Sequence, residues 1–600
     1  MSNPFTHRTH KGLLSLLALA CSLILLTPAK AQNPNGITTV FYILLENRCF
    51  TSGTDTSYNN ILFNNKNGGS PYLTALCTPG SNAYTVNYQG NTISQTSHAS
   101  FCSAYHHVFA TYNGTNTTPY YVENEIANQP QSQSVHPSEP NYIFMEAGSN
   151  LSILNDNEPY SGGSVAATKT FLNAHKSFSG QNLSALLQNA GVSWTSYNEG
   201  TCLLNTSNQD YNSTRTGGNT LTNNVAAPGV RTVPLSSFSG TSSNYTNPYN
   251  GSHQFDFATK HTGQLFFEAT NGSSGSANTS PSNPAISHYA PLEQLTSDLA
   301  NNTQAQYCVI TPDQFNDGHT SLSAGFTYHN YGGTNNGVNH VFASGDLSRI
   351  GQMDNFCAIL VPQIMASPVY QAGHAAIVLW TDETEGSPQN DFYHTLLEIV
   401  ISPLAKGNAY NSTLNYTHSS DLATMQEVFG VAANTPTGYL NDAANPSIPT
   451  PTGVTVTVNN GQGLQTATGQ PFFGFGTGIA QDLSDLFQPG VIPAGIPALT
   501  YTPSNYAFNR RTNQYSQTVT VTNTASVTVN GPIYVVVNGL TNATLANSAG
   551  TSSTYYPGSP YVLVSNGLAA GASAVVTLTF NSTGTISDVL EVVAPGSGTP

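Results

Sequence analysis

Two short, largely apolar segments, far apart in the chain, each end in acidic residues. Residues 38–45 stop at Glu46, and residues 375–381 stop at Asp382 and Glu383. Short apolar runs without alternation are typical of strands in a parallel sheet that is covered on both faces. Ligands of open α/β sheets bind beyond the carboxyl ends of the strands. The pattern therefore predicts that acidic side chains from distant parts of the chain meet at one edge of a sheet.

These acidic residues need a reason for their position, because only 7% of the residues are charged. A hard metal cation requires several oxygen ligands at one point, and Glu46, Asp382 and Glu383 would supply them. Two loop ends with hydrogen-bonded carboxylates are the alternative. We favour the metal site.

Helices and strands alternate over the rest of this region. Residues 183–190 form a short amphipathic helix closed by Gly191, which is typical of a helix end. A second helix is expected over residues 422–429, with Ser419 or Ser420 as its cap, and residues 398–402 read as a buried strand. We expect an α/β fold with a mostly parallel sheet between helices.

The pattern changes beyond the segment 488–497, which is rich in proline and glycine. Short β-type runs separated by turn residues follow it, at residues 518–522, 533–537, 561–564 and 574–580. This spacing predicts an all-β sandwich. Because the segment from Val491 onward has no histidine or cysteine and few charges, we do not expect it to carry the chemistry.

The first residues have the features of a secretory signal. Arg8 and Lys11 precede an apolar run over residues 13–26, and the sequence Ala29-Lys30-Ala31 fits a cleavage site. No later apolar run is long enough to span a bilayer. We therefore expect a signal peptide over 1–31, a catalytic domain over 32–490 and a β-sandwich over 491–600, in a secreted or periplasmic protein.

Charge and cysteine content narrow the classes of partner. Without the signal the chain has 11 basic and 30 acidic residues, a net charge of −19, which argues against nucleic acid or an anionic membrane as a partner. Six cysteines remain, an even number that favours disulfides in an oxidising compartment. They are Cys49, Cys77, Cys102, Cys202, Cys308 and Cys357. None has metal-type spacing, and their pairing stays open.

Eight short blocks occur in the order found in a known family. They are Phe41–Arg48, His136–Tyr142, Ala147–Ser149, Val192–Tyr197, Lys260–His261, Asn316–His319, Trp380–Glu383 and Ile401–Pro403. Together they resemble the bacterial phosphoesterase family of acid phosphatases and phospholipases C. The resemblance covers roughly residues 38–487 and implies an alkaline phosphatase-like fold there. For the C-terminal region, the β-type pattern leads us to expect an immunoglobulin-like sandwich.

The resemblance also implies the metal ligands. It assigns Glu46, Asn47, Asp382 and Glu383 to the metal, with Ser149 as a fifth ligand and as the nucleophile. All-oxygen ligation favours magnesium, calcium, manganese or iron over zinc.

The nucleophile is the least constrained of these assignments. Ser149 follows a segment, residues 144–150, that reads as a strand leading into a turn, and no G-x-S-x-G elbow precedes it. Ser138 and Ser152 are local competitors. Cys77 imitates the start of a sulfatase nucleophile block but lacks its arginine, so we interpret it as half of a disulfide.

Two histidines complete the predicted site. His261 and His319 resemble the family's phosphate-pocket histidines. One would bind phosphoryl oxygens while the other protonates the leaving alkoxide. His418 also stands at a recurring family position, but we assign it no role and interpret it as structural.

The expected function is hydrolysis of a phosphate ester through a phosphoserine intermediate. A phosphomonoesterase is the first interpretation, and a phospholipase C acting on phospholipid diesters is an alternative. A surface binding protein with a relict phosphatase domain is the non-enzymatic alternative. The β-sandwich would then contact a cell surface or a polysaccharide in any of these cases.

Overall fold

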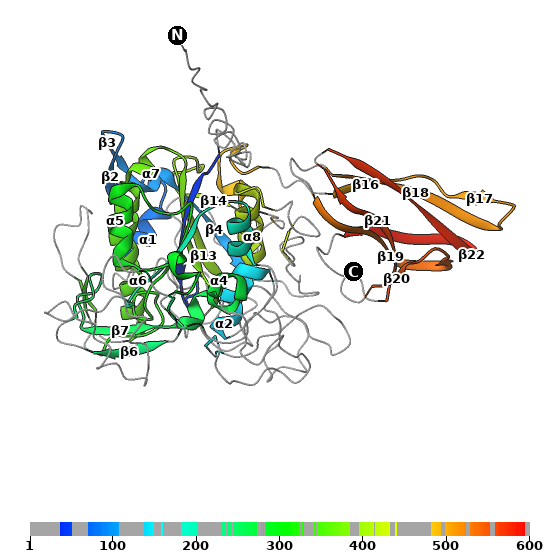
Figure 1. Ribbon diagram of the computed structural model, residues 1–600. Helices are drawn as coiled ribbons and strands as arrows, with labels where there is room; N and C mark the ends of the chain where they lie inside the picture. The colour runs from blue at the N-terminus through cyan, green and yellow to red at the C-terminus, as the bar shows by residue number, and fades with distance from the viewer. Residues whose placement is uncertain are drawn as a thin grey trace, which may run out of the picture. The chain divides into compact units, whose positions relative to one another are not determined.

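The computed structural model describes most of the chain apart from its N-terminus and several long insertions. The described residues are 36–50, 70–106, 137–148, 156, 158–159, 182–201, 231, 233–235, 237–241, 245–272, 278, 280, 282–323, 326–328, 340–342, 345–384, 395–412, 414–431, 439–440, 480, 482–493, 499–523, 529–552, 558–569 and 571–593. The chain divides into Met1–Pro34 and Asn35–Pro600, and the first unit, with the expected signal, lies outside the described residues. The second contains two large β-sheets (Figure 1).

The first sheet has nine strands, and most of its pairs are parallel. Their order is β14-β4-β13-β12-β1-β9-β5-β8, with β15 beside β4. The strands are β1 (Thr39–Leu45), β4 (Ala99–His106), β5 (Trp194–Asn198), β8 (Tyr289–Pro291), β9 (Tyr307–Thr311), β12 (Ala375–Thr381), β13 (Leu396–Ile401), β14 (Tyr410–Ser412) and β15 (Tyr416–Thr417). Among the described pairs, β12–β13 and β13–β4 are the antiparallel ones. The expected mostly parallel sheet is confirmed.

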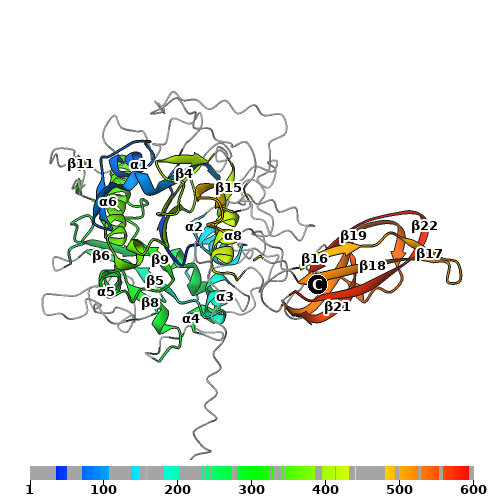
Figure 2. The same cartoon turned by 90° about the horizontal axis from the view of Figure 1, so that it is seen from above.

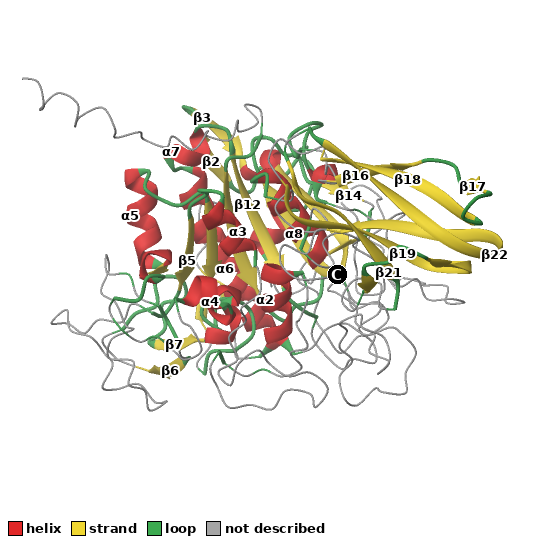
Figure 3. Ribbon diagram, turned by 45° about the vertical axis from the view of Figure 1, so that its right-hand side comes forward, coloured by secondary structure: helices red, strands yellow, loops and turns green. Residues whose placement is uncertain are grey.

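Helices cover both faces of this sheet, so its central strands are buried on both sides. In β1, Phe41 and Ile43 enter one apolar core while Val40 and Leu44 enter the other. Helices α1 (Pro71–Leu76), α5 (Glu293–Asn301), α6 (Asp346–Met365) and α7 (Pro368–Gln371) pack on the first core, and α2 (Ser138–Ala147), α3 (Leu183–Asn189) and α8 (His418–Val428) pack on the second. Figures 2 and 3 show the strands between these two helical layers.

Local sequence signals explain where the helices end and begin. Helix α3 ends one residue before Ala190, and Gly191 adopts a φ of +76°, as its predicted role requires. Helix α8 begins at His418, four residues before the expected start. Its N-cap is Thr417 and not a serine. The Thr417 side chain accepts a hydrogen bond from the Ser419 backbone N–H, and the Ser420 hydroxyl oxygen accepts one from the Thr417 backbone N–H, as in a capping box.

The second sheet is antiparallel throughout its described pairs and has a core of its own. Its order is β16-β18-β22-β19-β21-β20, with β17 beside β18. The strands are β16 (Leu499–Pro503), β17 (Ala507–Asn509), β18 (Gln514–Asn523), β19 (Val529–Leu545), β20 (Gly550–Thr551), β21 (Pro560–Leu568) and β22 (Ser573–Val593). Register shifts interrupt the long β19–β22 pair, and such irregularities curl a sheet. The all-β character is confirmed, and the immunoglobulin-like arrangement stays a prediction.

Among the described elements, three two-stranded hairpins and a short helix lie outside the two large sheets. Hairpins form between β2 (Thr85–Tyr88) and β3 (Asn91–Ser94), between β6 (Phe238–Thr241) and β7 (Gln254–Phe257), and between β10 (Phe326–Tyr328) and β11 (His340–Phe342); α4 (Glu268–Asn271) is a single turn. Within the described part of the chain, no helix has both the length and the apolar composition needed to cross a membrane.

The cysteines correct one expectation. Cys77, Cys102, Cys308 and Cys357 are buried free thiols, so a largely disulfide-bonded set is wrong for these four, and Cys77 is not half of a disulfide. Each one packs as a small apolar side chain, Cys102 in one core and the others in the opposite core. The even number of cysteines therefore does not mean that these four form disulfides. Burial raises the pKa of all four thiols, which makes them unreactive in the folded state.

We predict that these thiols react only after unfolding. The folded protein should react slowly with a thiol-specific chromogenic reagent, because the four sulfur atoms are buried and protonated. After denaturation without reductant, at least the four thiols named above should titrate per chain. Fewer reactive thiols in the denatured protein would contradict the structure and restore the disulfide hypothesis.

Candidate metal centre

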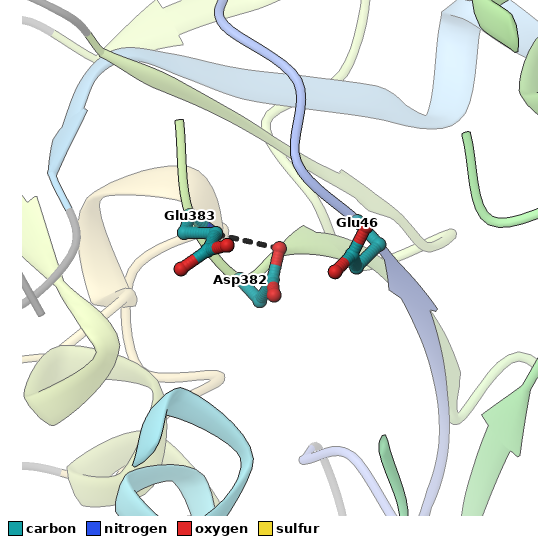
Figure 4. A group of neighbouring side chains, drawn as sticks. All are labelled: Glu46, Asp382 and Glu383. Carbon is teal, nitrogen blue, oxygen red and sulfur yellow. Dashed lines mark hydrogen bonds between the residues drawn. The ribbon is translucent and has the colours of Figure 1, made fainter. Parts of the chain in front are cut away.

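The two acidic strand ends meet as the sequence predicts. Strands β1 and β12 are parallel neighbours with Leu45 opposite Thr381, so Glu46 and Asp382 leave the sheet at the same level. Glu46, Asp382 and Glu383 each place a carboxylate oxygen within 4.8 Å of the other two. Figure 4 shows the three carboxylates side by side, with Asp382 between the two glutamates. All three side chains are buried.

The turns after the two strands hold Asp382 in one orientation. Asn47 has a φ of +52°, a left-handed conformation that asparagine tolerates better than most residues, and its backbone N–H points at Asp382. Asp382 Oδ1 accepts from the N–H of Asn47 at 2.9 Å and from the N–H of Glu383 at 2.6 Å. Because Oδ1 is occupied by the backbone, Oδ2 is the oxygen left for another partner.

Three oxygens at this point lack hydrogen-bond donors. Glu46 Oε2, Asn47 Oδ1 and Asp382 Oδ2 are buried and accept no hydrogen bond from the described residues. Burial raises the pKa of Asp382, and the charges of Glu46 and Glu383 raise it further, so the cluster is unfavourable without a compensating positive charge. Oxygen donors from two carboxylates and an amide are those that a hard cation accepts. The residues present therefore fit such an ion.

A serine hydroxyl contacts this cluster from helix α2. Ser138 is the first residue of the helix, and its Oγ hydrogen-bonds to Glu46 Oε1 and lies 3.0 Å from Glu383 Oε1. The first turn of a helix presents free N–H groups and partial positive charge, which favour anions such as phosphate. The site thus combines an acidic cluster, a hydroxyl and an anion-binding helix end.

Ser149, the predicted nucleophile, lies outside the described residues, so its role stays a prediction. The segment before it is not the expected strand, because residues 144–147 form the last turn of α2. Gly148 follows as the left-handed C-cap, where any side chain would collide with the Leu440 carbonyl at 2.2 Å. A helix of ten residues is about 15 Å long. Ser138 and Gly148 therefore lie at opposite ends of α2, and Ser138 is the end at the acidic cluster.

Both predicted histidines approach Glu46. His261 is buried, with Nε2 3.6 Å from Glu46 Oε1, and His319 Nε2 lies 3.9 Å from Glu46 Oε2. Burial lowers the pKa of His261 well below its ordinary value. The His319 side chain is 38% exposed and so faces the open side of the site. The two rings therefore differ in solvent access as well as in position.

Asp317 and Tyr142 fix the ring of His261. Asp317 Oδ2 lies 3.5 Å from His261 Nδ1, and the Tyr142 ring stacks on His261 with centroids 4.6 Å apart. Asp317 also ties the surrounding loop together, because its carbonyl accepts from the Glu46 N–H at 2.9 Å and its Oδ1 accepts from the His319 N–H at 2.8 Å. One aspartate thereby connects both histidines with the end of β1.

The sequence interpretation missed two of these residues. In the sequence, Asp317 stands out only as part of the block Asn316–His319, and Ser138 only as a competitor of Ser149. A usable signal for Ser138 was present: Pro137, directly before it, and Pro140 both suit the first turn of a helix. A serine at a helix start next to an acidic cluster is better placed for phosphate than one in a turn.

Beyond the carboxyl ends of β1 and β12, the site thus brings three carboxylates together with a serine hydroxyl from helix α2. The model of the Phosphoesterase family matches residues 24–329, and the chain belongs to this family. The family resemblance of the sequence is confirmed, and membership supports phosphate esters as substrates. No curated protein matches the chain.

The solved structures add little. Among those that match is the crystal structure of a candidate sulfatase from Bacteroides thetaiotaomicron VPI-5482, with 10% identity and a TM-score of 0.27. The match covers 81% of this chain and 82% of that one. A TM-score this low gives the neighbour no weight for either fold or function.

We predict that a hard divalent cation stabilises the protein through this cluster. After chelation, added Mn²⁺ should raise the melting temperature, since an ion bound by the native state alone contributes about 2.7 kcal/mol at one hundred times its Kd. Glu46→Gln or Asp382→Asn should reduce the shift strongly by removing a ligand charge. Glu293→Gln, at a half-buried residue outside the cluster whose Oε2 is buried, should keep the shift. An equal shift in all four proteins would contradict the predicted site.

Proposed function

We propose that the protein is an exported, metal-dependent phosphoesterase that hydrolyses phosphate monoesters through a phosphoserine intermediate. The observation that carries the proposal is the contact of the Ser138 hydroxyl with two of the three clustered carboxylates. Family membership supports the substrate class. Export follows from the signal expected over residues 1–31, and the catalytic domain would be residues 32–490 in an alkaline phosphatase-like fold.

In this proposal Glu46, Asn47, Asp382 and Glu383 hold the cation, which is magnesium, calcium, manganese or iron. The unpartnered oxygens of Glu46, Asn47 and Asp382 support this ligand set. When bound, the cation would supply Lewis acidity toward a phosphoryl oxygen and lower the pKa of a coordinated hydroxyl. The protein's part is to keep four oxygen donors at one point in a buried site.

Ser138 is the nucleophile that the geometry favours, in place of Ser149. Its Oγ would form a bond to phosphorus while the bond from phosphorus to the ester oxygen breaks in line with it. The hydroxyl proton would leave toward the carboxylates that Oγ already contacts. Water would then attack the phosphoserine, which releases inorganic phosphate and restores the serine.

The two histidines divide the remaining tasks according to their exposure. His261 is buried and its ring is held by Asp317 and Tyr142, so it is suited to contact a phosphoryl oxygen in a fixed geometry. His319 faces the open side, where the leaving group departs. It would donate a proton to the leaving alkoxide and regain one when water attacks.

A lysine at the edge of the site supports an anionic substrate. The Lys260 ammonium pairs with Asp156, whose Oδ1 also accepts from the Glu139 N–H at the start of α2. The Asp156 carboxylate thus already binds two groups that favour negative charge, the Lys260 ammonium and the Glu139 N–H next to Ser138. A phosphate dianion suits the same groups, whereas the quaternary ammonium of a choline phospholipid does not.

We predict that Ser138, and not Ser149, carries turnover. The mature protein should hydrolyse p-nitrophenyl phosphate and lose this activity on chelation. Ser138→Ala should reduce kcat by roughly 10³-fold or more, because it removes the nucleophile, while Ser149→Ala should stay within a few-fold of wild type. Rapid quench with a ³²P-labelled monoester should label the peptide that contains Ser138.

Other outcomes select the alternatives. Activity in Ser138→Ala together with its loss in Ser149→Ala would restore the family-based assignment. Faster hydrolysis of phosphatidylcholine than of the monoester would favour a phospholipase C. Hydrolysis of neither substrate, with Mn²⁺ still bound, would favour a binding protein with a relict phosphatase domain.

A second role is proposed for residues 491–600, as an accessory domain with an immunoglobulin-like fold that contacts a polysaccharide. The observation that favours it is a groove of about 650 Å³ beside β17, β18 and the bend of β22. The rings of Phe508, which is 48% exposed, and Tyr515 lie side by side there, with their centroids 4.9 Å apart. The groove lining includes Tyr506, Phe508, Asn513, Tyr515, Thr583 and Thr585. Aromatic rings beside uncharged hydroxyl and amide groups suit the apolar faces and hydroxyls of sugars.

We predict that the full-length protein sediments with an insoluble polysaccharide through this groove. Phe508→Ala combined with Tyr515→Ala should weaken retention at least about fivefold, as loss of aromatic contacts at binding sites commonly does. Val575→Ala, which removes another exposed apolar side chain of the same sheet, is the matched control and should bind normally. Turnover of a soluble monoester should be equal in all three proteins. Unchanged retention in the double variant would exclude the groove.

A further inference from the structure

His418, the first residue of helix α8, forms a hydrogen bond to the acidic end of β12. Its ring is fully buried, and Nε2 lies 2.6 Å from the backbone carbonyl oxygen of Asp382. A carbonyl oxygen can only accept, so Nε2 must carry the proton. His418 therefore donates to the peptide that joins Asp382 to Glu383, two of the three clustered carboxylates.

The other ring nitrogen lies near the indole of Trp380. The indole N–H of Trp380 lies 3.0 Å from His418 Nδ1, and an indole nitrogen can only donate. The same N–H lies 3.0 Å from the Tyr105 hydroxyl oxygen, so His418 Nδ1 and Tyr105 share one donor. The direction of the bond to Asp382 is fixed by the carbonyl, which can only accept.

Two tyrosines and an aspartate complete the network behind the ring. The Tyr105 hydroxyl lies 2.7 Å from His418 Nδ1 and donates to Asp421 Oδ2 at 2.5 Å. Asp421 also accepts from the Tyr42 hydroxyl. These residues come from β4, β1 and α8, so the network joins three separate elements behind the ring. Buried hydrogen-bonded networks of this kind hold side chains in one arrangement.

We propose that His418 is a positioning residue of the metal centre, which fixes the Asp382–Glu383 peptide so that both carboxylates face the cation. The inference rests on the proposed function, because it requires these carboxylates to be ligands. The physical reason is that rotation of this peptide would turn both side chains at once. Groups behind a metal site typically change its affinity 10- to 100-fold when they are removed.

The test compares Mn²⁺ binding by calorimetry in chelator-treated, full-length variants. His418→Ala should raise the Kd for Mn²⁺ about 10- to 100-fold. His418→Gln can place an amide N–H near the position of Nε2, so its Kd should return to within a few-fold of wild type. With Mn²⁺ at saturating concentration, kcat for a phosphomonoester should recover in His418→Ala, because the residue does not touch the substrate.

Two further variants separate positioning from a general loss of packing. Trp380→Phe removes the donor to Nδ1 but keeps an aromatic ring, and it should weaken Mn²⁺ binding in the same direction as His418→Ala. His98→Gln is the control, since this histidine also bonds a tyrosine hydroxyl, that of Tyr370, but contacts none of the three carboxylates. Its Kd should equal that of wild type.

Each outcome decides the question. A wild-type Kd in His418→Ala, or in Trp380→Phe if the alanine variant fails to fold, would overturn the positioning role. A lower melting temperature of the metal-free variant with an unchanged Kd would assign the network to stability alone. Absence of Mn²⁺ binding in the wild-type protein would instead refute the proposed metal centre, and the inference with it.

Discussion

The constraint on which the site depends is the concentration of negative charge at the ends of β1 and β12. Three buried carboxylates lie within 4.8 Å of one another, in a medium where like charges repel far more strongly than in water. Isolated burial of such groups is expensive unless each one gains partners. The neighbouring elements supply them: backbone N–H groups to Asp382, the Ser138 hydroxyl to Glu46, and the rings of His261 and His319 nearby. This set is still incomplete, which is why a cation fits.

A second buried acidic pair has hydrogen-bond donors for its carboxylate oxygens. Glu199 and Asp313 follow neighbouring parallel strands, β5 and β9, and are also fully buried. Here Asn247 donates to both carboxylates, and Asn316 together with the Asp313 N–H donates to Glu199. Burial raises the pKa of Asp313 to about 8 and also raises that of Glu199. Both pairs are acidic strand ends in sequence, but among the described residues only the first leaves carboxylate oxygens without donors, and this difference makes the first pair the candidate metal site.

The sequence predicts the position of a residue where a strand end alone determines it. It does not predict the position of a residue where several elements together determine it. The meeting of Glu46 with Asp382 could be predicted, because parallel strands end at the same edge of a sheet. The position of Ser138 could not be read from periodicity, because α2 is buried around its whole circumference and carries no polar stripe. The cysteines failed for a related reason: composition and compartment say nothing about which core a thiol packs into. The sites of Ser149 and of the signal lie outside the described residues, so those predictions stand as made.

Helix α8 is the clearest case of information that only three dimensions hold. A histidine at the start of a helix is usually interpreted as a surface or capping residue, and no spacing in the sequence connects His418 with Asp382. The connection exists because β4 and β12 flank β13 and bring Tyr105 and Trp380 under the same ring. The sheet order thus places two of the groups that contact the ring, while the carbonyl of Asp382, which can only accept, sets the direction of the bond to its peptide. A candidate site assembled from two strand ends needs such a contact, since neither strand alone fixes the direction of the residue that follows it.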